Sequence, residues 1–255
     1  MTQISDGGKV SSLPPDAEDR EASVRPRNQR PWWRSPWVYA IAAIVVFNLI
    51  YALPRYLSFD PAQSRTVIDP AFPLHFPVVV LHVVTGNIAL VTLFVQLLPW
   101  IRRRFPAVHR ISGRVYTFAG VVPATLSALV LLPYSTAPMG KLGLATMAVL
   151  WLAATLVGLR RARQRRWVDH RRWMLYSFAL ALGTSWGRVI GQFAIPGKDM
   201  DIAIFFDISS WMGWVVSLVA VHWWLERTSP RRAAARRTPT ATVAGGDEDG
   251  GRLAA

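Results

Sequence analysis

Long apolar runs alternate with short, arginine-rich polar segments along most of this chain. A helix needs about 20 apolar residues to cross a hydrocarbon core of about 30 Å, and the runs have that length. We therefore expect an all-α, polytopic membrane helix bundle that occupies residues 36–227. The pattern predicts six transmembrane helices, at residues 37–54, 77–99, 113–135, 142–159, 173–195 and 206–225.

The two ends of the chain differ from this pattern. Residues 1–30 and 228–255 are rich in Ser, Pro, Gly, Asp, Glu and Arg and contain few large apolar side chains. Such segments cannot bury enough apolar surface to offset the entropy of folding. We therefore expect disordered cytoplasmic tails at residues 1–35 and 228–255.

Two features inside residues 36–227 predict local irregularity. Pro123 lies within the third apolar run and should kink that helix, which neighbouring helices can accommodate in lipid. The segment 55–76 is the longest predicted connection and is the expected place for a short surface helix. His75, at the end of that connection, is expected to be an ordinary exposed histidine.

Basic residues are concentrated in four places. Of the 29 Lys and Arg residues, 24 lie before residue 36, in 100–114, in 160–172 or after 226. The connections between these clusters hold at most two basic residues each. Because cytoplasmic segments carry the excess of Lys and Arg, this distribution predicts that both termini are cytoplasmic and that the number of spans is even.

Composition narrows the class of protein further. The chain is 52% hydrophobic and only 17% charged, whereas soluble domains carry about 25% charged residues. The net charge of +14 is explained better by attraction to anionic lipid headgroups than by nucleic-acid binding, because the basic residues flank apolar runs. The sequence has no Cys, which excludes disulfides, zinc–thiolate sites and iron–sulfur clusters. The expected partner is the lipid bilayer.

Polar residues inside apolar helices mark the first candidate site. Spacings of three and four residues place two sets of them on one face of the second and fifth helices. Both faces should point into the bundle, and His82 and Arg188 reach similar depths in the outer half. With Gln192 they would form an outer-half pocket for an anionic or quinone-like headgroup. The alternative is structural: Arg188 pairs with Asp207, and His82 bonds to a neighbouring helix. The two sets are His82, Thr85, Ala89, Thr92 and Gln96, and Ser177, Ala181, Thr184, Arg188 and Gln192.

Three histidines near the predicted inner face mark the second candidate site. His109 precedes the third helix, His170 precedes the fifth, and His222 lies near the inner end of the sixth. Imidazole is a common haem ligand, and helix bundles hold such cofactors between helices, so these residues predict a possible b-type haem site. An acid such as Asp169 would then fix the histidine tautomer. Alternatively, the histidines contact lipid phosphates or cap helix starts. No metal site and no catalytic residue is predicted.

The fifth helix also carries a ladder of small residues. Gly183, Gly187 and Gly191 recur at every fourth position. Small residues at this spacing let two helices approach closely in a membrane. A groove against a flat cofactor is the alternative interpretation.

Several of these residues lie in motifs that resemble a family of bacterial membrane proteins, domain of unknown function family 2306. That resemblance implies a multi-pass protein of the bacterial plasma membrane and implies no established activity. The layout also resembles, more weakly, b-type cytochromes and membrane ferric reductases. The motifs are L-H-V-V-T-G (81–86), H-R-I-S-G-R-V-Y (109–116), Trp151, H-R-R-W-M-L-Y-S-F-A-L (170–180) and Arg188.

Three function classes remain open from the sequence. The first is a redox protein with b-haem ligated by His109 and His170, with a quinone near His82 and Arg188. The second is a small-molecule or lipid carrier that uses the outer-half pocket, and the third is a non-catalytic scaffold subunit. Motifs of P-loop nucleotide hydrolases, zinc metalloproteases and serine hydrolases do not occur in the sequence.

Overall fold

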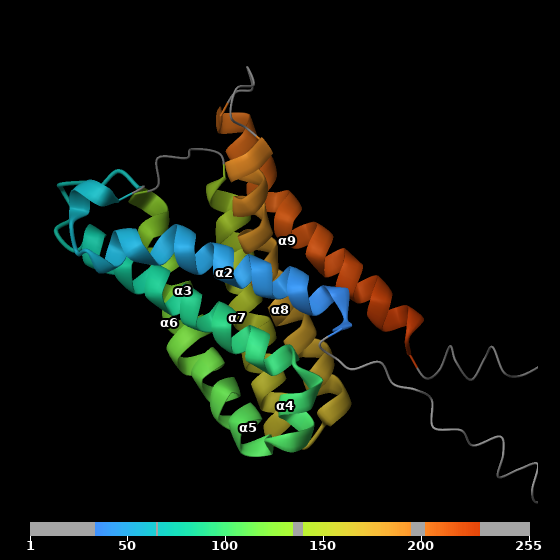
Figure 1. Cartoon of the computed structure of the whole chain (residues 1–255). Helices are drawn as coiled ribbons and strands as arrows, with labels where there is room; N and C mark the ends of the chain where they lie inside the picture. The colour runs from blue at the N-terminus through green and yellow to red at the C-terminus, as the bar shows by residue number, and fades with distance from the viewer. Residues whose placement is uncertain (1–33, 65, 135–139, 195–201, 230–255) are drawn as a thin grey trace, which may run out of the picture.

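The computed structural model describes residues 34–64, 66–134, 140–194 and 202–229. All regular structure in these residues is helical, which confirms the all-α class (Figure 1). The tails predicted to be disordered lie almost entirely outside the described residues. The long helices are α2 (Pro36–Leu57), α3 (His75–Leu97), a continuous helix made of α5 (Pro106–Arg114), η3 (Val115–Val121) and α6 (Val122–Leu131), α7 (Lys141–Arg163), α8 (Trp167–Ala194) and α9 (Ile202–Arg227).

Four of these helices are long and apolar enough to cross a membrane: α2, α3, the helix Pro106–Tyr134 and α7. α8 and α9 have the required length, with 28 and 26 residues. The beginning of α8 is polar, since it carries Asp169, His170, Arg171 and Arg172. The prediction of membrane-spanning helices is therefore supported, and the count of six spans stays a prediction.

Three helices begin four or more residues earlier than predicted. α9 begins at Ile202 instead of 206, and the other two begin with turns that contain a histidine. The third long helix begins at Pro106 and α8 begins at Trp167, each several residues before the apolar run. Proline is favoured in the first turn of a helix, and arginine has a high helix propensity. His109 and His170 therefore lie inside helices, not before them. The same residue preferences produce the short helix α4 (Pro99–Arg104), which was not predicted.

The predicted irregularity at Pro123 takes the form of a π-helical segment. η3 (Val115–Val121) has the wider π-helical turns and ends just before Pro123, which lies in the first turn of α6. Proline has no N–H for the preceding turn, so the helix cannot continue with regular hydrogen bonds. Gly120 in η3 packs directly on α3, because a Cβ there would lie 2.9 Å from the Ala89 Cα.

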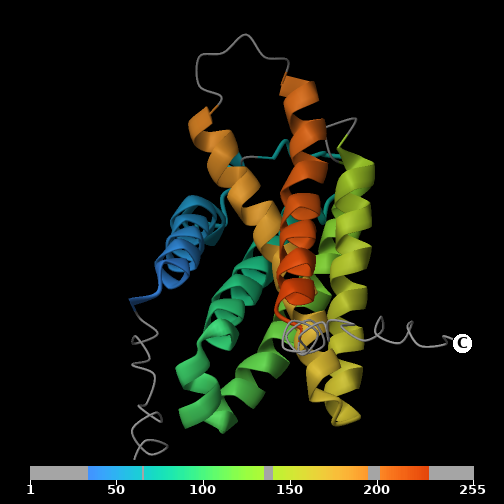
Figure 2. The same cartoon turned by 90° about the vertical axis from the view of Figure 1, so that its right-hand side faces the viewer.

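The bundle has a tightly packed side and a more exposed side. α7, α8 and α9 pack side by side, while α2 lies outside this group and packs mainly against α3 (Figure 2). The main apolar core cluster draws its residues from α3, η3, α6, α7, α8 and α9. α8 and α9 touch through backbone, because a Cβ on Gly183 would lie 2.5 Å from the Trp214 Cα. This contact confirms the close-packing interpretation at Gly183, whereas the placement of Gly187 and Gly191 lies outside the described part of the structure.

The connection between α2 and α3 contains the expected short helix, η2 (Pro61–Gln63), and Asp60 caps it by accepting the Ala62 N–H at 2.9 Å.

The prediction that His75 is an exposed histidine is wrong. His75 is 1% exposed, and its Nδ1 accepts the Asp69 N–H at 2.9 Å. The connection folds back so that the His75 ring packs against Phe72 and Tyr134. Sequence position alone could not reveal this contact with the end of the third helix.

Candidate functional site

His109, in α5, and His170, near the start of α8, lie close enough for the charge of His170 to act on His109. In α8, His170 donates its Nδ1–H to the Gly158 carbonyl of α7 at 2.8 Å, since a carbonyl oxygen can only accept. In α5, the Nδ1 of His109 is buried and has no hydrogen-bond partner. The groups whose charges act on His109 are Arg102, His170 and Arg110, and all of them can only add positive charge.

The backbone around His109 is fixed to α3. Gln96, near the end of α3, donates its side-chain amide to the His109 carbonyl at 2.5 Å and to the Ser112 hydroxyl at 2.7 Å. Gly113 leaves room for this amide, because a Cβ there would lie 3.3 Å from Nε2 of Gln96. The backbone that carries the His109 side chain is therefore fixed to α3 by a buried polar contact.

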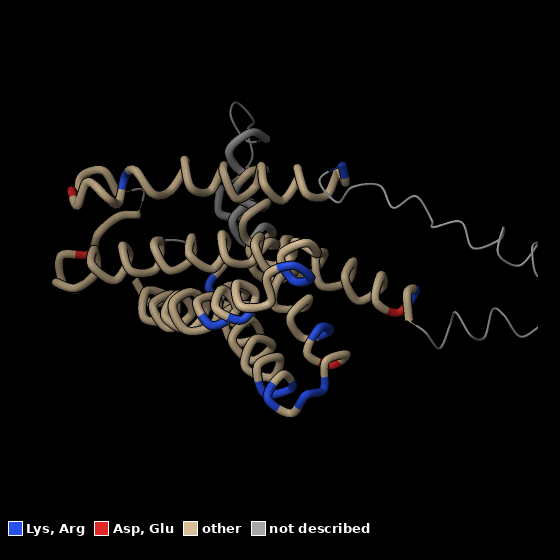
Figure 3. The backbone as a smooth tube through the Cα atoms, turned by 60° about the horizontal axis from the view of Figure 1, so that its bottom comes forward, with Lys and Arg blue, Asp and Glu red and all other residues tan. Residues whose placement is uncertain are grey.

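The surroundings of the two histidines are strongly basic. Arginine residues gather along α4, α5 and the α7–α8 turn (Figure 3). Partial burial, Arg171 and Arg103 together lower the pKa of Arg102 from its usual value. A pKa lowered by other arginines means that α4 and the start of α8 bring positive charges close together. This arrangement favours an anionic ligand.

The third histidine of the predicted inner-face set lies in a different network. His222 is exposed on α9, and its Nδ1 is 2.9 Å from the Tyr176 hydroxyl. Arg172 donates to the same hydroxyl at 3.1 Å and forms an ion pair with Glu226 at 3.1 Å. This network joins α8 to α9 at the surface. His222 takes part in it and not in the hydrogen bonds around His109 and His170.

Asp169, the acid expected to orient a histidine, forms an ion pair with Arg166 at 2.6 Å. The Gly158 carbonyl takes that orienting role for His170 instead. Among the described residues, no group of three or more His, Asp or Glu side chains could hold a metal ion.

The predicted outer-half pocket is described only in part. His82 Nδ1 lies 2.9 Å from the Ala124 carbonyl and 3.4 Å from the Ser127 hydroxyl, so it joins α3 to α6. This is the structural role given above as the alternative. Arg188 and Gln192 belong to α8, but their side chains, like that of Asp207, lie outside the described part of the structure.

A second polar cluster, not predicted from the sequence, lies in the middle of the bundle. The Tyr116 hydroxyl is 2.6 Å from the Ser177 hydroxyl and accepts the Trp151 indole N–H at 3.0 Å. Thr155 completes this buried network, with its hydroxyl 2.7 Å from that of Ser177. The network joins η3, α7 and α8. Its sequence signal is weak, because each residue alone looks like ordinary core.

The three strongest motifs noted in the sequence thus meet in space. The motif 109–116 supplies His109 and Tyr116, and the motif 170–180 supplies His170 and Ser177. The Tyr116 hydroxyl contacts the Ser177 hydroxyl directly and accepts the Trp151 N–H. One end of this arrangement is a basic histidine pair, and its centre is a hydrogen-bonded core. A helical bundle with apolar spans and such an internal polar arrangement defines a polytopic membrane protein.

Comparison with known proteins assigns the family. The chain belongs to the family described as Predicted membrane protein (DUF2306), whose model matches residues 79–225, more than half of the chain. The match extends beyond the motifs noted in the sequence, since it includes most of α9. No curated protein and no solved structure matches the chain.

Proposed function

We propose that this protein is a six-span integral protein of the bacterial plasma membrane with both termini in the cytoplasm, and that His109 and His170 hold one b-type haem near its cytoplasmic face. The observation that carries the haem proposal is the buried, unpaired Nδ1 of His109, which lies within electrostatic range of His170. A buried imidazole nitrogen without a partner is costly, and a bound ligand would compensate that cost.

The residues present fit the chemistry of haem. His170 donates Nδ1–H to a backbone carbonyl, which is the arrangement that orients a histidine and leaves its other nitrogen for iron. Haem carries two propionates, and the surrounding Arg102, Arg110 and Arg171 supply matching positive charge. Bound haem would supply one-electron transfer. His222 belongs to a separate network, so one haem is the number that the described histidines support.

Removing either proposed ligand is expected to abolish haem binding. The full chain is expressed with added haem and purified in detergent, and its visible spectrum is recorded. We expect a Soret band in the wild-type protein and its loss in His109→Ala and His170→Ala, because imidazole ligation holds b-type haem in place. His222→Ala is the matched control and should keep the band.

Two outcomes would contradict the haem proposal. One is a wild-type protein without a Soret band although it is folded and monodisperse. The other is a protein in which His222→Ala loses the band while His109→Ala keeps it.

The proposed orientation rests on charge. The basic residues of α4, α5 and the α7–α8 turn gather together in the bundle, as the positive-inside rule expects for one side of a membrane. An alkaline phosphatase reporter, which is active outside the cytoplasm, should be inactive when fused after Arg227 or within the α7–α8 turn. The same reporter should be active when inserted between α2 and α3. Activity of the fusion after Arg227 would reject the six-span arrangement without affecting the haem test.

A further inference from the structure

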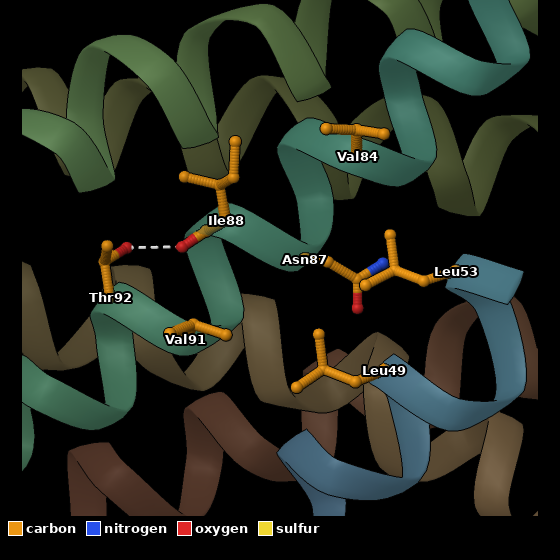
Figure 4. A pocket seen from close by; sticks show the side chains of 7 residues that line it. All are labelled: Leu49, Leu53, Val84, Asn87, Ile88, Val91 and Thr92. Atoms are coloured by element: carbon orange, nitrogen blue, oxygen red, sulfur yellow. Dashed lines mark hydrogen bonds between the residues drawn. The ribbon is translucent and has the colours of Figure 1, made fainter. Parts of the chain in front are cut away.

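A groove lies between α2 and α3, which supply all of its lining residues. Its volume is about 280 Å³. Exposed apolar side chains flank it, such as Ile50, which is 70% exposed, and Val91. In a membrane this surface would face lipid tails. The lining residues are Leu49, Leu53, Val84, Asn87, Ile88, Val91 and Thr92 (Figure 4).

Asn87 is the feature that distinguishes this groove from an ordinary packing gap. Its side chain is buried, with 6% exposed, and its Nδ2 donates to the Val83 carbonyl at 2.8 Å. Because a carbonyl can only accept, this bond fixes which end of the amide faces the helix. The other end, Oδ1, is buried and has no hydrogen-bond partner. The amide lies between the side chains of Leu49 and Leu53 (Figure 4).

The remaining lining of the groove offers a ligand little else that is polar. Thr92 donates its hydroxyl to the Ile88 carbonyl at 2.6 Å, within its own helix. The other five lining residues are aliphatic. The surface of the groove is therefore apolar, and one unpaired hydrogen-bond acceptor, Oδ1 of Asn87, lies buried beneath it. An unpaired polar atom there is costly, because no water replaces the missing bond.

We infer that this groove binds a membrane-soluble alcohol or phenol: an apolar chain or ring whose single hydroxyl donates to Oδ1 of Asn87. A molecule that can only accept, such as an ether or an oxidised quinone, cannot pair with this oxygen. The volume lies near the lower end of small-molecule sites, roughly 300–1,000 Å³. The groove therefore holds the hydroxyl-bearing end, and the rest of the molecule continues along α2 among the lipid tails. The site does not depend on the proposed haem.

The test compares ligands that differ only in the donor. Tritiated farnesol is bound to the purified full chain in lipid nanodiscs, with empty nanodiscs as background. Unlabelled farnesol should displace it about tenfold better than farnesyl methyl ether, which lacks the O–H. A short-chain prenyl hydroquinone and its oxidised quinone form a second pair, and the reduced form should compete better. If farnesol binds more tightly than the hydroquinone, the natural ligand is an alcohol. If the hydroquinone binds more tightly, it is a phenol.

Variants locate the site. Asn87→Leu keeps the size of the side chain and removes the acceptor, so it should weaken farnesol binding about tenfold and leave binding of the methyl ether unchanged. Leu49→Trp should fill the groove and prevent binding of both. Ile50→Trp adds the same indole on the neighbouring exposed position and should change neither.

Asn87→Leu also provides a readout that does not need a ligand. Replacing a buried amide whose oxygen has no partner by an apolar group should raise the unfolding temperature of the ligand-free protein. A raised unfolding temperature would rule out misfolding as the cause of weaker binding. The proposal is overturned if the ether and the alcohol bind equally, or if farnesol binds Leu49→Trp as well as the wild type.

Discussion

Gly183→Ala is expected to destabilise the bundle strongly, because it places a methyl group inside the backbone contact between α8 and α9. The new Cβ would lie 2.5 Å from the Trp214 Cα and 2.8 Å from the Gly213 carbonyl oxygen. Both obstacles are backbone, so no side-chain rotation relieves the collision and α8 must move away from α9. Overpacking of a core costs about 1–3 kcal/mol, and we expect a value at the upper end of this range. Unfolding of the purified protein by sodium dodecyl sulfate, followed by tryptophan fluorescence, measures the loss.

The matched control for this substitution is Gly86→Ala in α3. A Cβ at Gly86 meets no atom within 4 Å. Alanine in a helix interior is favoured over glycine by roughly 0.5–1 kcal/mol, so this variant should be as stable as the wild type or slightly more stable. If both alanine variants unfold at the same detergent concentration, α8 and α9 do not touch through Gly183 in the membrane protein.

Tyr116→Phe is expected to cost roughly 1–3 kcal/mol, because it leaves the buried Trp151 indole N–H without an acceptor. In the native protein that N–H donates to the Tyr116 hydroxyl at 3.0 Å, and Ser177 lies 2.6 Å from the same oxygen. The substitution changes little volume, so the loss would report the hydrogen-bond network and not packing. The midpoint of detergent unfolding measures it, and Tyr39→Phe, at a position 61% exposed, is the neutral control.

A double-mutant cycle isolates the contact between the tyrosine and the indole. Trp151→Phe removes the donor, and the combined Tyr116→Phe/Trp151→Phe variant has neither partner. The stability loss of the double variant should be smaller than the sum of the two single losses, by about 0.5–3 kcal/mol for residues in contact. Strict additivity would show that the network contributes no coupling between η3 and α7.

The sequence was most informative about features that depend only on the order of residues along a single helix. Apolar runs predicted the helices, and spacings of three and four predicted which faces point inward, as the burial of Thr85, Gln96 and Ser177 confirms. Gly183 was recognised as a packing residue, because close approach of helices requires small residues. Helix ends were less accurate, since arginine-rich turns continue a helix beyond its apolar part.

The histidines show where sequence reasoning stops. Their positions along the helices indicated similar depth for His109, His170 and His222, but depth says nothing about which neighbour each side chain faces. The structure separates His222, which bonds to Tyr176, from the other two. His75 was expected to be exposed and is buried, because a connection that folds back onto the third helix leaves no periodic signal.

By itself the sequence determined the class of the protein and most of its helices, because hydrophobic length acts through local composition along the chain. The tertiary structure alone decided that Tyr116, Trp151 and Ser177 share one network and that Asn87 faces a groove. These contacts depend on how each helix is rotated and on what packs against it, and that information arises only when helices distant in the sequence meet.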